Sequence, residues 1–86
     1  MKKKIQASII IRTKNEEQWI ESCLTKIFNQ KKISFEVILV DNNSTDKTVA
    51  KAKKFNVKVI KISKYFPGKA INIGASKANG KYIVCL

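Results

Sequence analysis

Apolar residues fall into short runs that alternate with stripes of helical spacing along the chain. The runs at 7–11, 35–40, 57–62 and 82–86 are rich in β-branched or aromatic residues and predict four strands. The run at 7–11 is almost continuously apolar, as is typical of a strand buried on both faces of a parallel sheet.

The segments between these runs predict three helices. In the first, Asn15 should act as N-cap, with Gln18 completing a capping box and the helix ending near Gln30. Its apolar stripe is formed by Trp19, Ile20, Cys23, Leu24, Ile27 and Phe28.

The second helix should begin at Ser44 or Thr45 and carry Asp46 as a helix-end charge. Phe66-Pro67-Gly68 is expected to break the chain after the third strand. Small residues then mark a third helix, which Asn79-Gly80 should stop.

This order of elements, βαβαβαβ, predicts an α/β fold with a doubly wound, Rossmann-like parallel sheet, because crossovers between parallel strands are right-handed. Residues 1–86 should form one domain and no second domain is expected. Since the chain stops at an apolar strand, where a crevice residue would come next, we interpret it as a truncated half-domain.

Composition and charge narrow the class of partner. Eighteen Lys and Arg against six Asp and Glu give a net charge of +12, which attracts phosphates, nucleic acid or anionic lipid. The chain has no His, so the commonest general base and metal ligand is missing. Cys23 and Cys85 are expected to be buried small hydrophobes. The apolar stretch after Met1 is too short for a signal peptide, which predicts a cytoplasmic location.

Polar residues follow the predicted strands. The segments 12–15, 41–44 and 63–69 should lie together, because carboxyl ends of parallel strands share one edge of the sheet. Cations near helix starts suit a diphosphate, and Asp41 suits a ribose hydroxyl or a base N–H. The alternative is that Asp41 only caps a turn. Neither G-x-G-x-x-G nor G-x-x-x-x-G-K-[ST] is present, which argues against a dinucleotide dehydrogenase and a P-loop NTPase.

Four ordered segments together resemble the N-terminal half of a family 2 glycosyltransferase of the GT-A fold: Ser8-Ile-Ile-Ile-Arg-Thr-Lys-Asn-Glu-Glu, Phe35-Glu-Val-Ile-Leu-Val-Asp-Asn-Asn-Ser-Thr-Asp, Gly68-Lys-Ala-Ile-Asn-Ile-Gly and Gly80-Lys-Tyr-Ile-Val. The resemblance implies inverting transfer of a sugar from a nucleotide-diphosphate donor, with a UDP-sugar favoured, to a hydroxyl acceptor such as a lipid-linked glycan in cell-surface polysaccharide synthesis. One departure is Lys14, where the family more often has Tyr near the base.

The resemblance also implies roles for particular residues. Thr13 and Asn15 fall in the first nucleotide-contacting loop, Asp41 and Asn42 in the base and ribose turn, and Lys69 and Asn72 beside the nucleotide. A divalent metal, Mg²⁺ or Mn²⁺, is implied for the full enzyme, with its Asp-x-Asp ligands and the catalytic base beyond Leu86 and no metal ligand within this chain.

Plainer interpretations stay open for several of these residues. Asn15 could only cap the helix, Lys69 could be solvated surface, and Trp19 is expected in the core or an interface rather than as a sugar platform. The competing functions are a basic nucleic-acid-binding module and attachment to an anionic membrane surface at the inner face of the membrane. No sequence-specific nucleic-acid partner is expected, since the aromatic residues fall at predicted core positions.

Overall fold

The computed structural model describes residues 5–30, 33–63 and 67–86, with the backbone alone for residues 67–71. Its strands are β1 (Ala7–Thr13), β2 (Phe35–Asn42), β3 (Val57–Ile62) and β4 (Tyr82–Cys85), and its helices are α1 (Ile20–Phe28), α2 (Thr48–Ala52) and α3 (Pro67–Ser76). The predicted βαβαβαβ order is confirmed.

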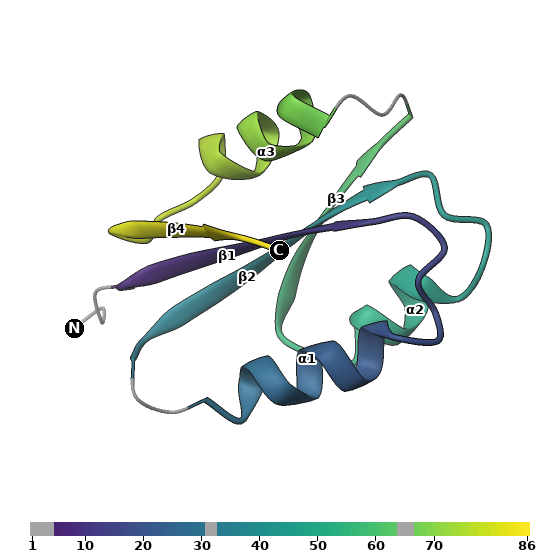
Figure 1. Ribbon diagram of the computed structural model, residues 1–86, viewed down its shortest axis with the longest axis horizontal. Helices are drawn as coiled ribbons and strands as arrows, with labels where there is room; N and C mark the ends of the chain where they lie inside the picture. The colour runs from purple at the N-terminus through teal and green to yellow at the C-terminus, as the bar shows by residue number, and fades with distance from the viewer. Residues whose placement is uncertain (1–4, 31–32, 64–66) are drawn as a thin grey trace.

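All strand pairs are parallel and the sheet order is β3-β2-β1-β4. Figure 1 shows α1 and α2 on one face of the sheet and α3 on the other. This distribution follows from right-handed crossovers: the chain steps outward from β1 to β3, then returns across the sheet to place β4 on the far side of β1. The switch in winding direction lies between β1 and β4, the position where open α/β sheets bind ligands.

Each face of the sheet has its own hydrophobic layer. Under α1 and α2, the buried residues are Ile11, Ile20, Leu24, Val37, Leu39 and Ala52. Under α3, they are Ile10, Ile38 and Val40. Alternating residues of β1 and β2 therefore serve opposite layers, which explains why both strands read as apolar runs.

Two glycines let the third crossover lie against the sheet. A Cβ on Gly74 would meet Ile10 Cγ2 at 2.7 Å, so α3 packs on β1 at glycine distance. A Cβ on Gly80 would lie 2.6 Å from the backbone atoms Ala7 C and Ser8 N. Neither glycine has a positive φ, so backbone conformation does not require glycine at these positions. The close approach of neighbouring chain segments, which leaves no room for a Cβ atom, requires it instead.

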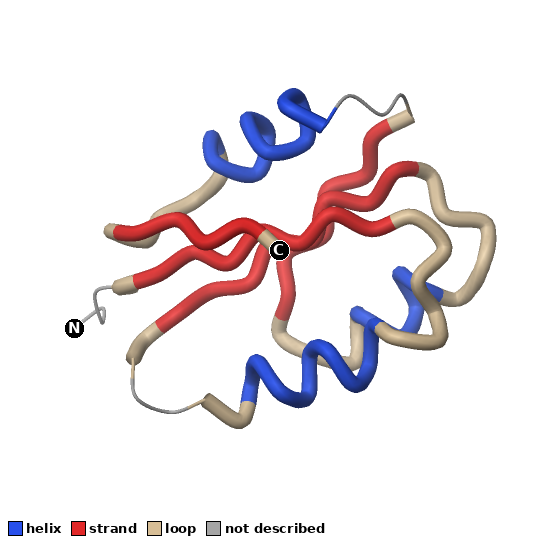
Figure 2. Tube along the Cα trace, in the orientation of Figure 1, coloured by secondary structure: helices blue, strands red, loops and turns tan. Residues whose placement is uncertain are grey.

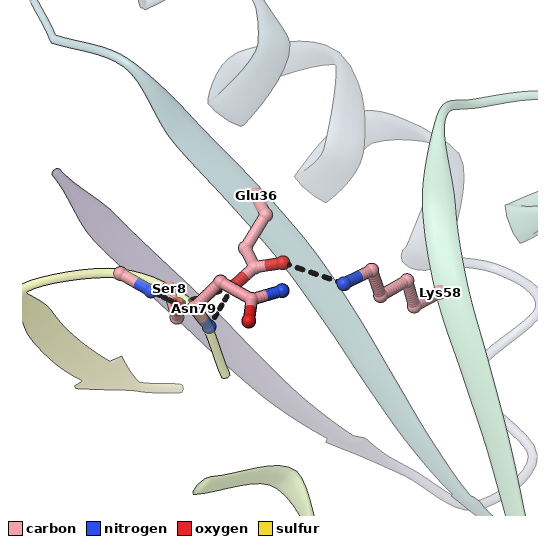
Figure 3. Close-up of polar contacts among 5 residues, drawn as sticks. Ser8, Glu36, Lys58 and Asn79 are labelled. Carbon is pink, nitrogen blue, oxygen red and sulfur yellow. Dashed lines mark hydrogen bonds and ion pairs between the residues drawn. The ribbon is translucent and has the colours of Figure 1, made fainter. Parts of the chain in front are cut away.

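A polar cluster closes the edge of the sheet where β1, β2 and β3 begin (Figure 3). Glu36 accepts hydrogen bonds from the Ser8 hydroxyl at 2.6 Å and the Asn79 N–H at 2.5 Å, and pairs with Lys58 Nζ at 2.9 Å. The Gly80 N–H donates to Ser8 Oγ at 2.8 Å. Burial raises the pKa of Glu36, but the hydrogen bonds and the Lys58 charge outweigh it, so the pKa lies below its ordinary value.

The start of α1 differs from the prediction. The helix begins at Ile20 and its first cap position is Trp19, without a side-chain cap bond. Asn15 has a left-handed φ of 52° and lies in the connection ahead of the helix, so the capping-box prediction is wrong. Trp19 precedes the helix and is 66% exposed, so the core position predicted for it is wrong, while the interface alternative stays a prediction.

The other helices also shift. α2 begins at Thr48, so the start predicted at Ser44 or Thr45 is wrong. Asp46 lies ahead of the helix rather than in its first turn, and there it accepts a hydrogen bond from the Thr48 N–H at 3.0 Å. Pro67 opens α3 rather than breaking the chain, because proline is well suited to a first helical turn. Cys85 is exposed because β4 is an edge strand, which contradicts its predicted burial, and Cys23 is half-buried.

Candidate nucleotide site

A pocket of about 350 Å³ lies at the carboxyl end of the sheet. It is lined by Arg12, Thr13 and Lys14 from the end of β1, together with Glu16, Asn42 and Leu86. These residues come from the ends of β2, β1 and β4, which are consecutive strands in the sheet. The pocket therefore occupies the switch point at which a doubly wound sheet offers a ligand site.

A buried carboxylate, Asp41, holds the pocket-lining residue Thr13. Asp41 is 1% exposed, and its Oδ1 accepts the hydroxyls of Thr13 and Ser44, each at 2.6 Å. Its Oδ2 accepts the Ser44 N–H at 2.9 Å. Asp41 thus closes the turn after β2, the plainer of its two predicted roles, and lies outside the pocket wall. Its contact with a nucleoside stays a prediction.

The polar wall of the pocket is formed by neighbours of Asp41. Asn42, 8% exposed, and Thr13, 5% exposed, both line the pocket from buried positions. Arg12 and Lys14 add two cations, and Glu16 adds one carboxylate to the same lining. The lining charge is net positive, which suits an anion bearing further hydrogen-bonding groups.

Asn15 and Asn72 are not among the residues that line this pocket. The Asn15 side chain faces the β2–α2 connection, where its Oδ1 accepts the Thr45 N–H at 2.8 Å. Asn72 lies on the exposed surface of α3. Lys69 lies in the first turn of α3, not in a loop, and its side chain is outside the described residues. The structure thus brings Thr13 and Asn42 together in the pocket, with Asp41 behind them.

Metal ligands do not gather in the part of the chain that the structure describes: no group of three His, Cys, Asp or Glu residues could hold an ion there. Asp41 is occupied by three protein donors. Burial raises the pKa of Asp46, but hydrogen bonds from the Thr48 hydroxyl and from the N–H groups of Thr48 and Glu17 outweigh it, leaving the pKa below its usual value. The described residues therefore do not fit a divalent-metal centre.

Sequence reasoning missed two contributors to this region. Glu16 follows the predicted N-cap and is not among the predicted site residues, yet it lines the pocket, ahead of a helix that begins only at Ile20. Ser44 bridges two connections through its hydroxyl and could have been found only as a small polar residue in a turn.

Residues 8–86 match the family described as Glycosyl transferase family 2. A relative from Methanococcus voltae, dolichyl N-acetyl-alpha-D-glucosaminyl phosphate 3-beta-D-2,3-diacetamido-2,3-dideoxy-beta-D-glucuronosyltransferase, is 37% identical over 86 residues, covering 90% of this chain and 27% of the relative. The chain therefore spans about a quarter of that relative's length.

Solved structures give the same result for the fold. Staphylococcus aureus TarS in complex with UDP superimposes with a TM-score of 0.85 at 31% identity, covering 95% of this chain and 27% of that one. A mannosyltransferase from Pyrobaculum calidifontis, in complex with GDP-Man and Mn²⁺, has a TM-score of 0.82 at 24% identity, covering 91% of this chain and 26% of that one, and supports the fold alone. With the family match over nearly its whole length, the chain belongs to glycosyl transferase family 2 and has an α/β, Rossmann-like fold that it shares with GT-A glycosyltransferases.

Proposed function

We propose that this chain is the donor-binding part of an inverting glycosyltransferase that takes a nucleoside diphosphate sugar, with UDP as the favoured nucleotide. The observation that carries the proposal is the pocket at the β1–β4 switch point, with a net positive lining and buried polar groups from β1 and β2. UDP is favoured because TarS, 30–31% identical to this chain, has been solved with UDP and with UDP-GlcNAc.

In this proposal different pocket residues bind different parts of the donor. Arg12 and Lys14 attract the diphosphate, because guanidinium and ammonium groups form charge-assisted hydrogen bonds with phosphate oxygens. Thr13 and Asn42 present polar groups to the nucleoside, with Asp41 behind them accepting hydrogen bonds. The Glu16 carboxylate repels an anion in its part of the pocket wall. The diphosphate is therefore expected nearer Arg12 and Lys14.

The proposed reaction is attack of an acceptor hydroxyl oxygen on the anomeric carbon, with the bond to the nucleotide diphosphate breaking and the acceptor proton passing to a general base. Since the chain spans about a quarter of the Methanococcus voltae relative and of the TarS structure with UDP, the catalytic base, the acceptor site and a divalent-metal site are proposed to lie outside the described residues. The acceptor class, a lipid-linked glycan or cell-surface polysaccharide, is part of the same proposal.

A cytoplasmic location at the inner face of the membrane is also proposed, because a net charge of +12 favours anionic lipid headgroups. None of the helices in the described ranges is long and apolar enough to cross a bilayer. Attachment would therefore use lysine side chains at the surface rather than a spanning segment of the described part.

Nucleic-acid binding is a weaker candidate. Phe28 lies 5.5 Å from Phe35 and 5.7 Å from Phe55 between ring centroids, so these rings pack within the protein. Trp19 and Tyr82 are both exposed. Trp19 follows the carboxyl end of β1 in the chain, whereas Tyr82 is the register partner of Ala7, the first residue of β1. The two exposed rings thus lie at opposite ends of the sheet and do not form one stacking surface.

Calorimetry with UDP tests the proposed function. Saturable binding of UDP, stronger than that of UMP or inorganic phosphate, is expected, and Lys14→Gln should weaken it about fivefold or more through loss of a charge-assisted hydrogen bond. Lys53→Gln is the matched control, because Lys53 is exposed after α2 and away from the pocket. Equal, salt-sensitive retention of random DNA without saturable UDP binding would favour the nucleic-acid alternative.

A further inference from the structure

We infer that Ser44 and Asn15 are positioning residues that hold the β1–α1 connection in its pocket-lining conformation, without contacting the ligand. The inference rests on the proposed function, since it concerns the same pocket. Lys14 and Glu16, on either side of Asn15 in the sequence, both line the pocket. Contacts that fix the position of Asn15 therefore also fix the part of the pocket wall that carries the charges of Lys14 and Glu16.

A reciprocal pair of hydrogen bonds joins the two connections. The Asn15 N–H donates to Ser44 Oγ at 2.9 Å, and the Thr45 N–H donates back to Asn15 Oδ1 at 2.8 Å. The Ser44 hydroxyl in turn donates to Asp41 Oδ1 at 2.6 Å. A continuous chain of contacts therefore runs from the buried end of β2 to the backbone of the pocket wall.

Two further contacts extend this link toward α2. The Glu16 N–H donates to Thr48 Oγ1 at 2.7 Å, and the Glu17 N–H donates to Asp46 Oδ2 at 3.3 Å. The Lys51 ammonium donates to the Glu17 carbonyl oxygen at 3.0 Å. Three successive N–H groups, at positions 15, 16 and 17, thus end on side chains of the β2–α2 connection and α2, and Figure 1 shows the two connections running side by side.

The residue types fit this role rather than a general packing role. Asn15 and Asn43 have left-handed φ values of 52° and 51°, a conformation that asparagine tolerates better than most residues. Each lies in one of the two connections, and both are exposed. The partners of the two connections include the buried Asp41 and Thr48, and hydrogen bonds between polar groups join the two connections.

This arrangement has a measurable consequence for binding. If the β1–α1 connection already has its binding conformation before UDP arrives, UDP does not have to shift the connection from other conformations. The apparent affinity is then not reduced by a small population of the binding conformation. Removing the link should lower the populated fraction of the binding conformation, which weakens UDP binding while the two hydrophobic layers keep the fold.

The test compares Ser44→Ala, which removes the bridging hydroxyl, with Ser44→Thr, which keeps it. Ser44→Ala should weaken UDP binding about tenfold, as expected for loss of one or two hydrogen bonds, and Ser44→Thr should restore most of the affinity. Asn15→Gly is the second variant, because glycine accepts the left-handed φ but lacks the acceptor for the Thr45 N–H. Ser76→Ala is the control, since its exposed hydroxyl bonds Ile73 O at 2.7 Å within α3.

Amide hydrogen exchange separates this inference from the proposed function. In Ser44→Ala, exchange at Asn15 should accelerate by more than the accompanying loss of global stability accounts for, and it should slow again in Ser44→Thr. Unchanged UDP affinity in both Ser44→Ala and Asn15→Gly, with the wild-type chain binding UDP, would overturn the positioning role and leave the proposed function intact. Absence of UDP binding by the wild-type chain, with accelerated exchange in the variants, would overturn the proposed function instead.

Discussion

Thr13 and Asp41 are register partners across β1 and β2, and the Thr13 hydroxyl donates to Asp41 Oδ1 at 2.6 Å. Thr13 lines the pocket from one side of this bond, while Asp41 lies behind it with 1% of its surface exposed. A buried carboxylate with three donors therefore sets the orientation of a pocket-lining residue. The bond connects the stability of the sheet end to the shape of the proposed donor site.

Asp41→Asn should weaken both folding and UDP binding. An amide at this position presents donors toward the Thr13 and Ser44 groups that now donate to the carboxylate, so a stability loss of about 1–3 kcal/mol is expected in urea unfolding. UDP affinity should fall as well, by a similar free energy. Glu21→Gln, the same chemical change at an exposed ion pair with Lys54, is the control. Unchanged UDP affinity in Asp41→Asn would remove Asp41 from the site.

Glu36 should make stability depend on pH in the acid range. Its pKa in the folded chain lies below the ordinary 4.5, so between these two pKa values the unfolded chain binds a proton that the folded chain does not. The contribution of Glu36 is therefore full above 4.5 and is lost as pH falls through the folded pKa.

Glu36→Gln should flatten part of this acid dependence in unfolding experiments repeated from pH 7 down to pH ~3. Asp46, whose pKa is also lowered, keeps the remainder of the slope. An unchanged pH profile in Glu36→Gln, with the Glu21→Gln control also unchanged, would contradict the role given to the Ser8, Asn79 and Lys58 contacts.

The two glycines of the third crossover should differ in their tolerance of alanine. Gly80→Ala places a Cβ against backbone atoms that cannot move aside, so it should cost on the order of 3 kcal/mol. Gly74→Ala meets the Cγ2 methyl of the buried Ile10 side chain rather than backbone atoms, and gains roughly 1 kcal/mol of helix propensity, so its net cost should be smaller. Thermal unfolding measures the order, and a larger cost for Gly74→Ala would contradict it.

Trp19 should contribute little to stability despite its size. It is 66% exposed, so Trp19→Ala should change the free energy of unfolding by about 0.5 kcal/mol or less. Leu24→Ala, at a position with no exposed surface, should cost roughly 2–5 kcal/mol. A cost for Trp19→Ala comparable to that for Leu24→Ala would restore the core position predicted from the helical pattern.

The strands and their order could be predicted because each lies in a run rich in β-branched or aromatic residues, either nearly continuously apolar as at 7–11 or alternating with lysine as at 57–62. The predicted strand at 57–62 coincides with β3, and β1 and β2 begin where predicted but extend to Thr13 and Asn42. These extensions consist of polar residues that pair with neighbouring strands in the sheet. Such pairing depends on the tertiary structure, so the hydrophobic pattern of the sequence does not predict it.

The helix starts and the site were harder to predict, because both depend on contacts between connections distant in sequence. Asn15 has the residue type of an N-cap, yet its partners are Ser44 and Thr45, about 30 positions away. The pocket-lining Glu16 follows from the same late helix start. The sequence thus located the correct edge of the sheet but could not assign which polar residues there face the pocket.

Titration of UDP into the ¹⁵N-labelled chain, followed by amide chemical shifts, tests the central claim most directly, because it reports both binding and its location. Saturable shifts are expected to be largest at Arg12, Thr13, Lys14, Asn42 and Leu86. Lys14→Gln should reduce the affinity and Lys53→Gln should not. Shifts that fail to saturate, or that centre on the lysines of α2 instead of the pocket, would contradict the assignment of this pocket as the donor site.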